Sequence, residues 1–150
     1  DLSSPHKFNL AYTGEDGKEH KAFVVHRSSI GTFERIVALL IEKYVGAFPL
    51  WLSPVQVKVL PIGEAHLEYA KKVSDRLIQD GIRAELDESN ESLSKKIRNA
   101  KTEKAFYMLV IGDKEVADSA ITVEGREEKL GAMSVDEFVS KIKEEIKHRQ

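Results

Sequence analysis

The sequence of 150 residues contains no cysteine, which excludes a disulfide framework, a thiolate nucleophile and a cysteine-ligated metal. It has no apolar run near the roughly 20 residues that span a bilayer, and its start lacks the pattern of a signal peptide. An excess of positive charge is also missing, since 23 lysines and arginines are outnumbered by 25 aspartates and glutamates, the net charge is −2 and the pI about 6.3. These absences predict a cytoplasmic protein without membrane contact, in which any RNA binding depends on a local patch.

Complete catalytic motifs are missing as well. The glycines never fall in the spacing of a phosphate-binding loop or a dinucleotide fold, and there is no Ser-His-Asp elbow. The histidines are scattered without metal-ligand pairing, at positions 6, 20, 26, 66 and 148. Taken alone, these residues do not form a whole active site.

Two regions of the chain show different patterns. Residues 8–12 and 22–27 predict an antiparallel hairpin, and residues 32–44 predict a strongly apolar helix with Thr32 as its N-cap. Two prolines then interrupt the chain and indicate a linker. Two strands and one helix cannot enclose a core, so we expect the helix to pack against another surface or to self-associate.

Strands and helices alternate from residue 55 onwards. The pattern predicts strands at 55–60, 82–86, 106–111 and 121–123, and helices at 66–80, at 93–100 and after a Ser134–Glu137 capping box. Such alternation is typical of an α/β fold. We predict a mixed, largely parallel sheet of about five strands flanked by helices, with the N-terminal hairpin and helix attached beside it.

A Glu34-Arg35 pair lies in the first turn of the apolar helix, three residues after Gly31. This arrangement resembles motif 3 of class II aminoacyl-tRNA synthetases, in which the helix-borne arginine lies against the ATP phosphates. An arginine suits this task because its charge is permanent and its planar donors match anionic oxygens. The spacing alone is equally compatible with a surface pair of no function.

Longer blocks extend the resemblance to threonyl-tRNA synthetases over essentially the whole chain. They are His26-Arg27, residues 48–56 around Trp51, residues 107–115 ending in Gly-Asp-Lys-Glu, and residues 130–133. The resemblance implies a remnant of a class II catalytic domain in residues 1–47, a linker in 48–54 and an anticodon-binding domain in 55–150.

The resemblance also implies a parent reaction, the ATP-dependent attachment of threonine to its tRNA by a homodimeric enzyme. Arg35 would contact ATP, Thr32 would lie near the threonine site, and His26 would be one of three ligands of a catalytic Zn²⁺. Because the chain supplies one such ligand, we expect neither ATP nor Zn²⁺ to bind the isolated chain. It should recognise the anticodon of threonine tRNA without aminoacylating it.

The resemblance assigns anticodon contacts to Asn90, Lys114 and Glu115. A basic group on and after the middle helix could hold the RNA backbone, and its members are Lys95, Lys96, Arg98, Lys101 and Lys104. An asparagine offers a donor and an acceptor side by side, as a base edge requires, but Asn90 is equally suited to cap a helix. For the Lys-Glu pair the alternative is a solvated turn, and for the basic group an exposed helix face.

Two positions depart from the family pattern, because Lys104 and Glu124 stand where relatives often have arginine. A carboxylate at position 124 should repel phosphate, so that any contact there passes to Arg126.

Two other functions stay open. The chain could be a non-enzymatic RNA-binding or regulatory protein with an anticodon-binding-like domain, or part of another class IIa synthetase, for proline, histidine or glycine. The Gly31-x-x-Glu34-Arg35 pattern argues against the first, because a binding module has no use for an ATP-site helix. His26-Arg27 favours threonine.

Overall fold

The computed structural model describes residues 1–149 and divides into two compact units, Asp1–Val37 and the part from Ala38 onwards. The first unit holds α1 (Ser3–Lys7), β1 (Ala11–Thr13) and β2 (Glu19–Lys21), and α2 (Phe33–Tyr44) begins in it. Among the residues described, no helix is long and apolar enough to cross a membrane.

The N-terminal hairpin is present, but its strands lie closer to the turn than predicted. Tyr12 pairs with His20, and residues 22–27, predicted as a strand, form none. The physical reason is that the register of the hairpin, continued outward, would place residues 25–27 opposite residues 5–7, which belong to α1. The Asp1 carboxylate accepts from the main-chain N–H groups of Ser3 and Ser4 and starts this helix, so no partner strand is available further out.

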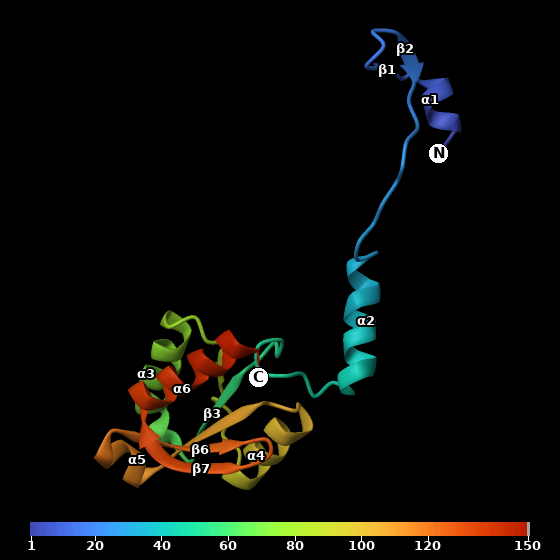
Figure 1. The fold of residues 1–150 in the computed structure, drawn as a ribbon. Helices are drawn as coiled ribbons and strands as arrows, with labels where there is room; N and C mark the ends of the chain where they lie inside the picture. The colour runs from blue at the N-terminus through green and yellow to red at the C-terminus, as the bar shows by residue number, and fades with distance from the viewer. Residues whose placement is uncertain (150) are drawn as a thin grey trace. The chain divides into compact units, whose positions relative to one another are not determined.

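The second unit is an α/β domain (Figure 1). Its five-stranded sheet has the strand order β4-β3-β5-β6-β7. Its elements are β3 (Val57–Pro61), the 3-10 turn η1 (Glu64–His66), α3 (Leu67–Gln79), β4 (Ala84–Leu86), α4 (Leu93–Thr102), β5 (Tyr107–Ile111), α5 (Asp113–Asp118), β6 (Ala120–Gly125), β7 (Lys129–Ser134) and α6 (Val135–His148). Strands β4, β3 and β5 are mutually parallel, whereas β6 and β7 are antiparallel to their neighbours. The predicted mixed α/β fold is confirmed.

Helices cover both faces of this sheet. On one face, Leu109 and Ile111 of β5 pack in one cluster with Leu77 of α3 and Phe138 of α6. On the other face, Met108 packs against Ala100 and its neighbours on α4. A strand covered on both faces is apolar throughout instead of alternating, which is why residues 106–111 were easily recognised as a strand.

The segment before the sheet is packed against it. Leu50 is fully buried, and the Gln56 side-chain amide donates to its main-chain oxygen over 3.0 Å. The guanidinium of Arg83 donates to the main-chain oxygens of Ser53 and Trp51, each over 2.9 Å. The proline-containing segment is therefore docked on the domain at several points.

Candidate functional site

The three parallel strands end at the same edge of the sheet, and each is followed by a polar loop. From β3 the chain crosses to β4 on one side and then returns past β3 to β5 on the other. Open α/β sheets bind ligands outside the carboxyl ends of their strands, where the strand order reverses in this way. The loops at 62–66, 87–92 and 112–115 are therefore the candidate site.

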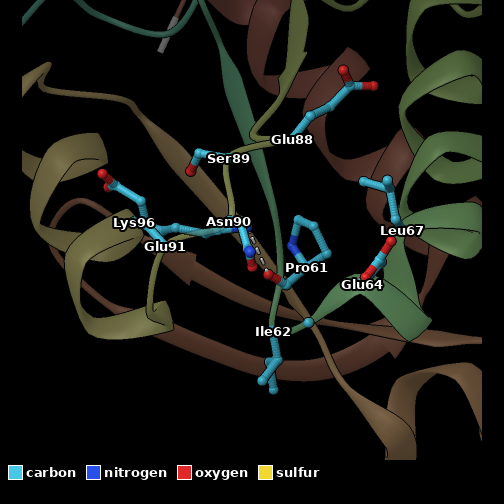
Figure 2. Close-up of a pocket in the computed structure, with 10 residues that line it drawn as sticks. Pro61, Ile62, Glu64, Leu67, Glu88, Ser89, Asn90, Glu91 and Lys96 are labelled. Carbon is cyan, nitrogen blue, oxygen red and sulfur yellow. Dashed lines mark hydrogen bonds between the residues drawn. The ribbon is translucent and has the colours of Figure 1, made fainter.

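A pocket of about 190 Å³ lies between the first two of these loops. Figure 2 shows the residues that line it, among them Asn90, Glu64, Glu88, Glu91 and Lys96. The Asn90 side chain is exposed at this pocket, and Ser92 is the N-cap of α4. The alternative interpretation of Asn90 as a helix cap is therefore wrong.

The chemistry of the pocket is that of a hydrogen-bond acceptor. Its three glutamates provide carboxylate oxygens, of which one on Glu91 is paired with Lys95 at 2.6 Å. Carboxylates attract N–H donors and repel phosphate. The pocket therefore suits the amino and imino edges of a base, not the nucleic-acid backbone.

The loop after β5 is fixed by Glu115. Its Oε2 accepts from the main-chain N–H of Gly112 at 2.9 Å, and its Oε1 accepts from the hydroxyl of Thr122 at 2.7 Å. The Thr122 hydrogen bond and then that of Gly112 favour the charged form and hold the Glu115 pKa below its usual value. Glu115 thus differs from a residue of a freely solvated turn, while its neighbour Lys114 is exposed.

A buried histidine joins the loops after β3 and β5. The Nδ1 atom of His66 lies 3.1 Å from the main-chain nitrogen of Gly63, which can only donate, so Nδ1 must be the acceptor. The proton of the neutral ring is therefore on Nε2, which donates to the carboxylate of Asp113 over 2.9 Å. This contact fixes the start of α5, beside Lys114.

Acid should weaken the β5 loop through Glu115. A carboxylate whose pKa is lowered on folding contributes stability above its unfolded value, near 4.5, and loses it as the pH falls through the folded pKa. We expect the unfolding free energy of Glu115→Gln to fall less with acid than that of the native chain, measured by urea denaturation from pH 6 to about pH 3. Glu127→Gln, an exposed control, should keep the native slope; an equal slope in Glu115→Gln would contradict the assignment.

The predicted basic residues do not all join this edge. Arg98 is exposed on α4, whereas Lys104 and Arg126 lie beside the start of β5, at its other end. At about 3.3 Å per residue, the two ends of this strand are roughly 13 Å apart. Lys104 Nζ donates to the main-chain oxygen of Val45, and Arg126 donates to those of Phe48 (3.1 Å) and Lys104 (2.6 Å).

Glu124, which stands where relatives often have arginine, forms an ion pair within the domain. The Glu124 carboxylate on β6 lies 2.9 Å from the ammonium group of Lys101 on α4. This pair neutralises one of the cations that the sequence offered for a phosphate contact.

The three residues assigned to catalysis lie in the first unit. Thr32 and Arg35 are exposed at the start of α2, and His26 Nε2 lies 3.3 Å from Asp1 Oδ2. No group of three potential metal ligands occurs in residues 1–149. These residues do not fit a catalytic Zn²⁺ by themselves, so no step is assigned to one.

The fold defines an α/β domain with a mixed five-stranded sheet, whose parallel strands end at one edge in polar loops. A family described as "Anticodon binding domain" matches residues 56–145, and the chain belongs to it.

Over nearly its whole length the chain is also similar to proteins named threonine–tRNA ligase. It is 45% identical over 150 residues to that of Sulfurihydrogenibium sp. (strain YO3AOP1), covering 99% of this chain and 23% of the relative. It is 49% identical over 149 residues to that of Geobacillus sp. (strain WCH70), covering 98% of this chain and 23% of the relative. The resemblance found in the sequence is confirmed, and the chain spans about a quarter of these relatives.

Solved structures agree. The RNA-binding domain of threonyl-tRNA synthetase from Cryptosporidium parvum Iowa II matches with a TM-score of 0.76 and 33% identity, covering 96% of this chain and 37% of that one. Prolyl-tRNA synthetase from Cryptosporidium parvum matches with a TM-score of 0.71 over 97% of this chain and 32% of that one, but its 17% identity shows the fold alone.

Several residues of the edge were not singled out from the sequence. They are Glu64, His66, Glu88 and Asp113. A usable signal existed for two of them, because Glu64 and Glu88 each follow a predicted parallel strand within a few residues. Lys96 was predicted as one of a group of cations for the RNA backbone, whereas the structure buries it. The burial of Lys96 and the pairing of His66 with Asp113 depend on tertiary packing and leave no local pattern.

Proposed function

We propose that this chain reads the anticodon of threonine tRNA as part of a threonine–tRNA ligase. The observation that carries the proposal is the acceptor-rich pocket at the carboxyl edge of a domain of the anticodon-binding family. Sequence-specific RNA readers bind unstacked bases through hydrogen bonds to their edges. A pocket with a free amide and several carboxylates, and few exposed cations, suits that type of contact.

Asn90 is the proposed central base reader, and Lys114 and Glu115, on the loop after β5, are the proposed further contacts to the anticodon. The amide of Asn90 can donate and accept at once, as an anticodon base edge requires. Each oxygen of Glu115 already accepts one hydrogen bond within the loop and has a second lone pair for a base N–H. Arg98 is the proposed contact to the anticodon-stem backbone, since it is exposed on the neighbouring α4.

The whole enzyme would use threonine and ATP in the cytoplasm and act as a homodimer. The relatives' names support the ligase reaction. Arg35 is the residue of this chain proposed to contact ATP, and Thr32 the one proposed near threonine. If the whole enzyme holds Zn²⁺, His26 would supply one ligand and the others would come from outside residues 1–149. The proposed division is a catalytic remnant (1–47), a linker (48–54) and an anticodon-binding domain (55–150).

The test is a titration of the 150-residue chain against a threonine-tRNA anticodon stem-loop at stated salt. Stem-loops with the second or third anticodon base changed serve as the comparison, since each lost base contact costs about 1–3 kcal/mol. We expect a loss of affinity of roughly tenfold or more for each change. Equal, weak, salt-sensitive binding to all stem-loops would refute base reading by this chain and leave only backbone affinity.

A further inference from the structure

One lysine of α4 is almost completely enclosed at the floor of the pocket. The Lys96 side chain is 4% exposed, although lysine side chains nearly always stay in water. Its ammonium group donates to the main-chain oxygens of Pro61 over 3.1 Å and Asp87 over 3.2 Å; the first bond is the dashed line in Figure 2. The Asp87 carboxylate lies further away, with Oδ1 at 4.0 Å. Burying an ammonium group is costly unless it is hydrogen-bonded, so these two acceptors fix where the side chain lies.

The two acceptors belong to the two strands that flank the pocket. Pro61 is the last residue of β3, and Asp87 is the first residue after β4. Asp87 also begins the loop to α4, where its Oδ1 accepts from the main-chain N–H of Ser89 at 2.9 Å. Lys96 therefore joins three elements at the root of the loop that carries Asn90.

We propose that Lys96 is a positioning residue for base recognition, an inference that rests on the proposed function. By holding the Pro61 and Asp87 carbonyls on one cation, it sets where the loop of residues 87–91 presents the Asn90 amide. Without the ammonium group, two carbonyls at the floor of the pocket lose their donor. The loop then shifts or loosens, and the base edge no longer meets its partner.

The first test is Lys96→Met, which keeps an unbranched side chain out to Cε and removes the ammonium group. We expect the ratio of affinities for the cognate and base-changed stem-loops to fall by about tenfold, while the salt dependence of binding stays as in the native chain. The double variant Lys96→Met/Asn90→Ala should be no less selective than Asn90→Ala alone, because both changes act on one contact. Additive losses would overturn the inference.

Lys58 provides a matched control on the same sheet. Its side chain is 10% exposed, and its ammonium group contacts the carboxylates of Glu85 (2.8 Å) and Glu103 (2.6 Å) instead of the loop backbone. Burial disfavours its charge, but the two carboxylates outweigh this and raise its pKa. Lys58→Met should lose stability and keep base selectivity. An equal loss of selectivity in both variants would mean that Lys96 is only a structural residue.

The absence of cysteine permits a chemical rescue. The Lys96→Cys chain can be unfolded, alkylated with 2-bromoethylamine and refolded. The resulting side chain carries an ammonium group and has the length of a lysine side chain. We expect the selectivity to return, and alkylation with iodoacetamide, which adds a neutral amide, to leave it lost. Failure of the aminoethyl adduct in a folded chain would contradict a role for the charge.

A readout without RNA separates this inference from the proposed function. In Lys96→Met the ¹⁵N order parameters of residues 88–91 should fall below those of the native chain, and in Lys58→Met they should not. An unchanged loop overturns the inference whatever the RNA result. If the native chain does not distinguish the stem-loops, the proposed function is refuted. If the native chain is selective and Lys96→Met is equally selective, the role of Lys96 is refuted.

Discussion

Asn90→Ala is expected to lose base selectivity by about 10- to 100-fold without unfolding the domain. The amide is exposed at the pocket and Ser92, not Asn90, is the N-cap of α4, so its removal deletes a ligand contact and no cap. A good pair of hydrogen bonds to a base edge is worth about 1–3 kcal/mol of discrimination. The measurement is the ratio of dissociation constants for the cognate stem-loop and one with a changed anticodon base.

Asn99→Ala is the control for this change. Asn99 is an exposed asparagine of α4 whose amide donates to Glu91 Oε2 at 3.3 Å. It should keep the native affinity ratio, because it does not line the pocket between β3 and β4. Equal losses in the two variants would show that the effect arises from the neighbourhood of α4 and not from the Asn90 amide.

Arg126→Ala is expected to lower the unfolding free energy by about 2–4 kcal/mol. Its guanidinium donates to two main-chain carbonyls and lies 5.0 Å from the centre of the Phe106 ring. Hydrogen bonds from a charged group contribute about 1.5–3 kcal/mol each, reduced here because Nε is buried without a partner in residues 1–149. The measurement is the urea midpoint of the chain.

Arg126→Lys separates this structural role from RNA contact. A lysine keeps the charge but cannot span the Phe48 and Lys104 carbonyls with a planar group. We therefore expect intermediate stability and native affinity for the stem-loop. An unchanged urea midpoint in Arg126→Ala, together with weaker RNA binding, would contradict the structural role and favour the phosphate contact predicted from the sequence.

Strong local patterns made most of the domain predictable. Ser134 caps α6 by accepting from the Glu137 N–H at 3.2 Å, as predicted, and Gly81 takes φ +82° just after α3, where helices commonly end on a glycine. Strand β7 was missed because it is an edge strand without a buried alternating face and contains Gly131 at φ +82°. Its existence depends on pairing with β6, which no local pattern encodes.

The candidate site was only partly predictable for a similar reason. The positions of Asn90, Lys114 and Glu115 after parallel strands could be anticipated from the order of elements. Whether a cation such as Arg126 contacts RNA or its own backbone depends on which carbonyls packing brings near it. The docked segment before β3 supplies that carbonyl at Phe48, 78 residues away in sequence.

The shape of the sheet's two edges has a consequence for how copies of the chain meet. An exposed strand is a template for pairing with another molecule, but β4 is three residues long, and β7 carries a glycine and pairs with β6 through an irregular register. Both edges are therefore poor starting points for growth into fibrils. In concentrated solution we expect any association to run through exposed side chains of α2, such as Leu39 and Ile41, and to remain reversible and helical.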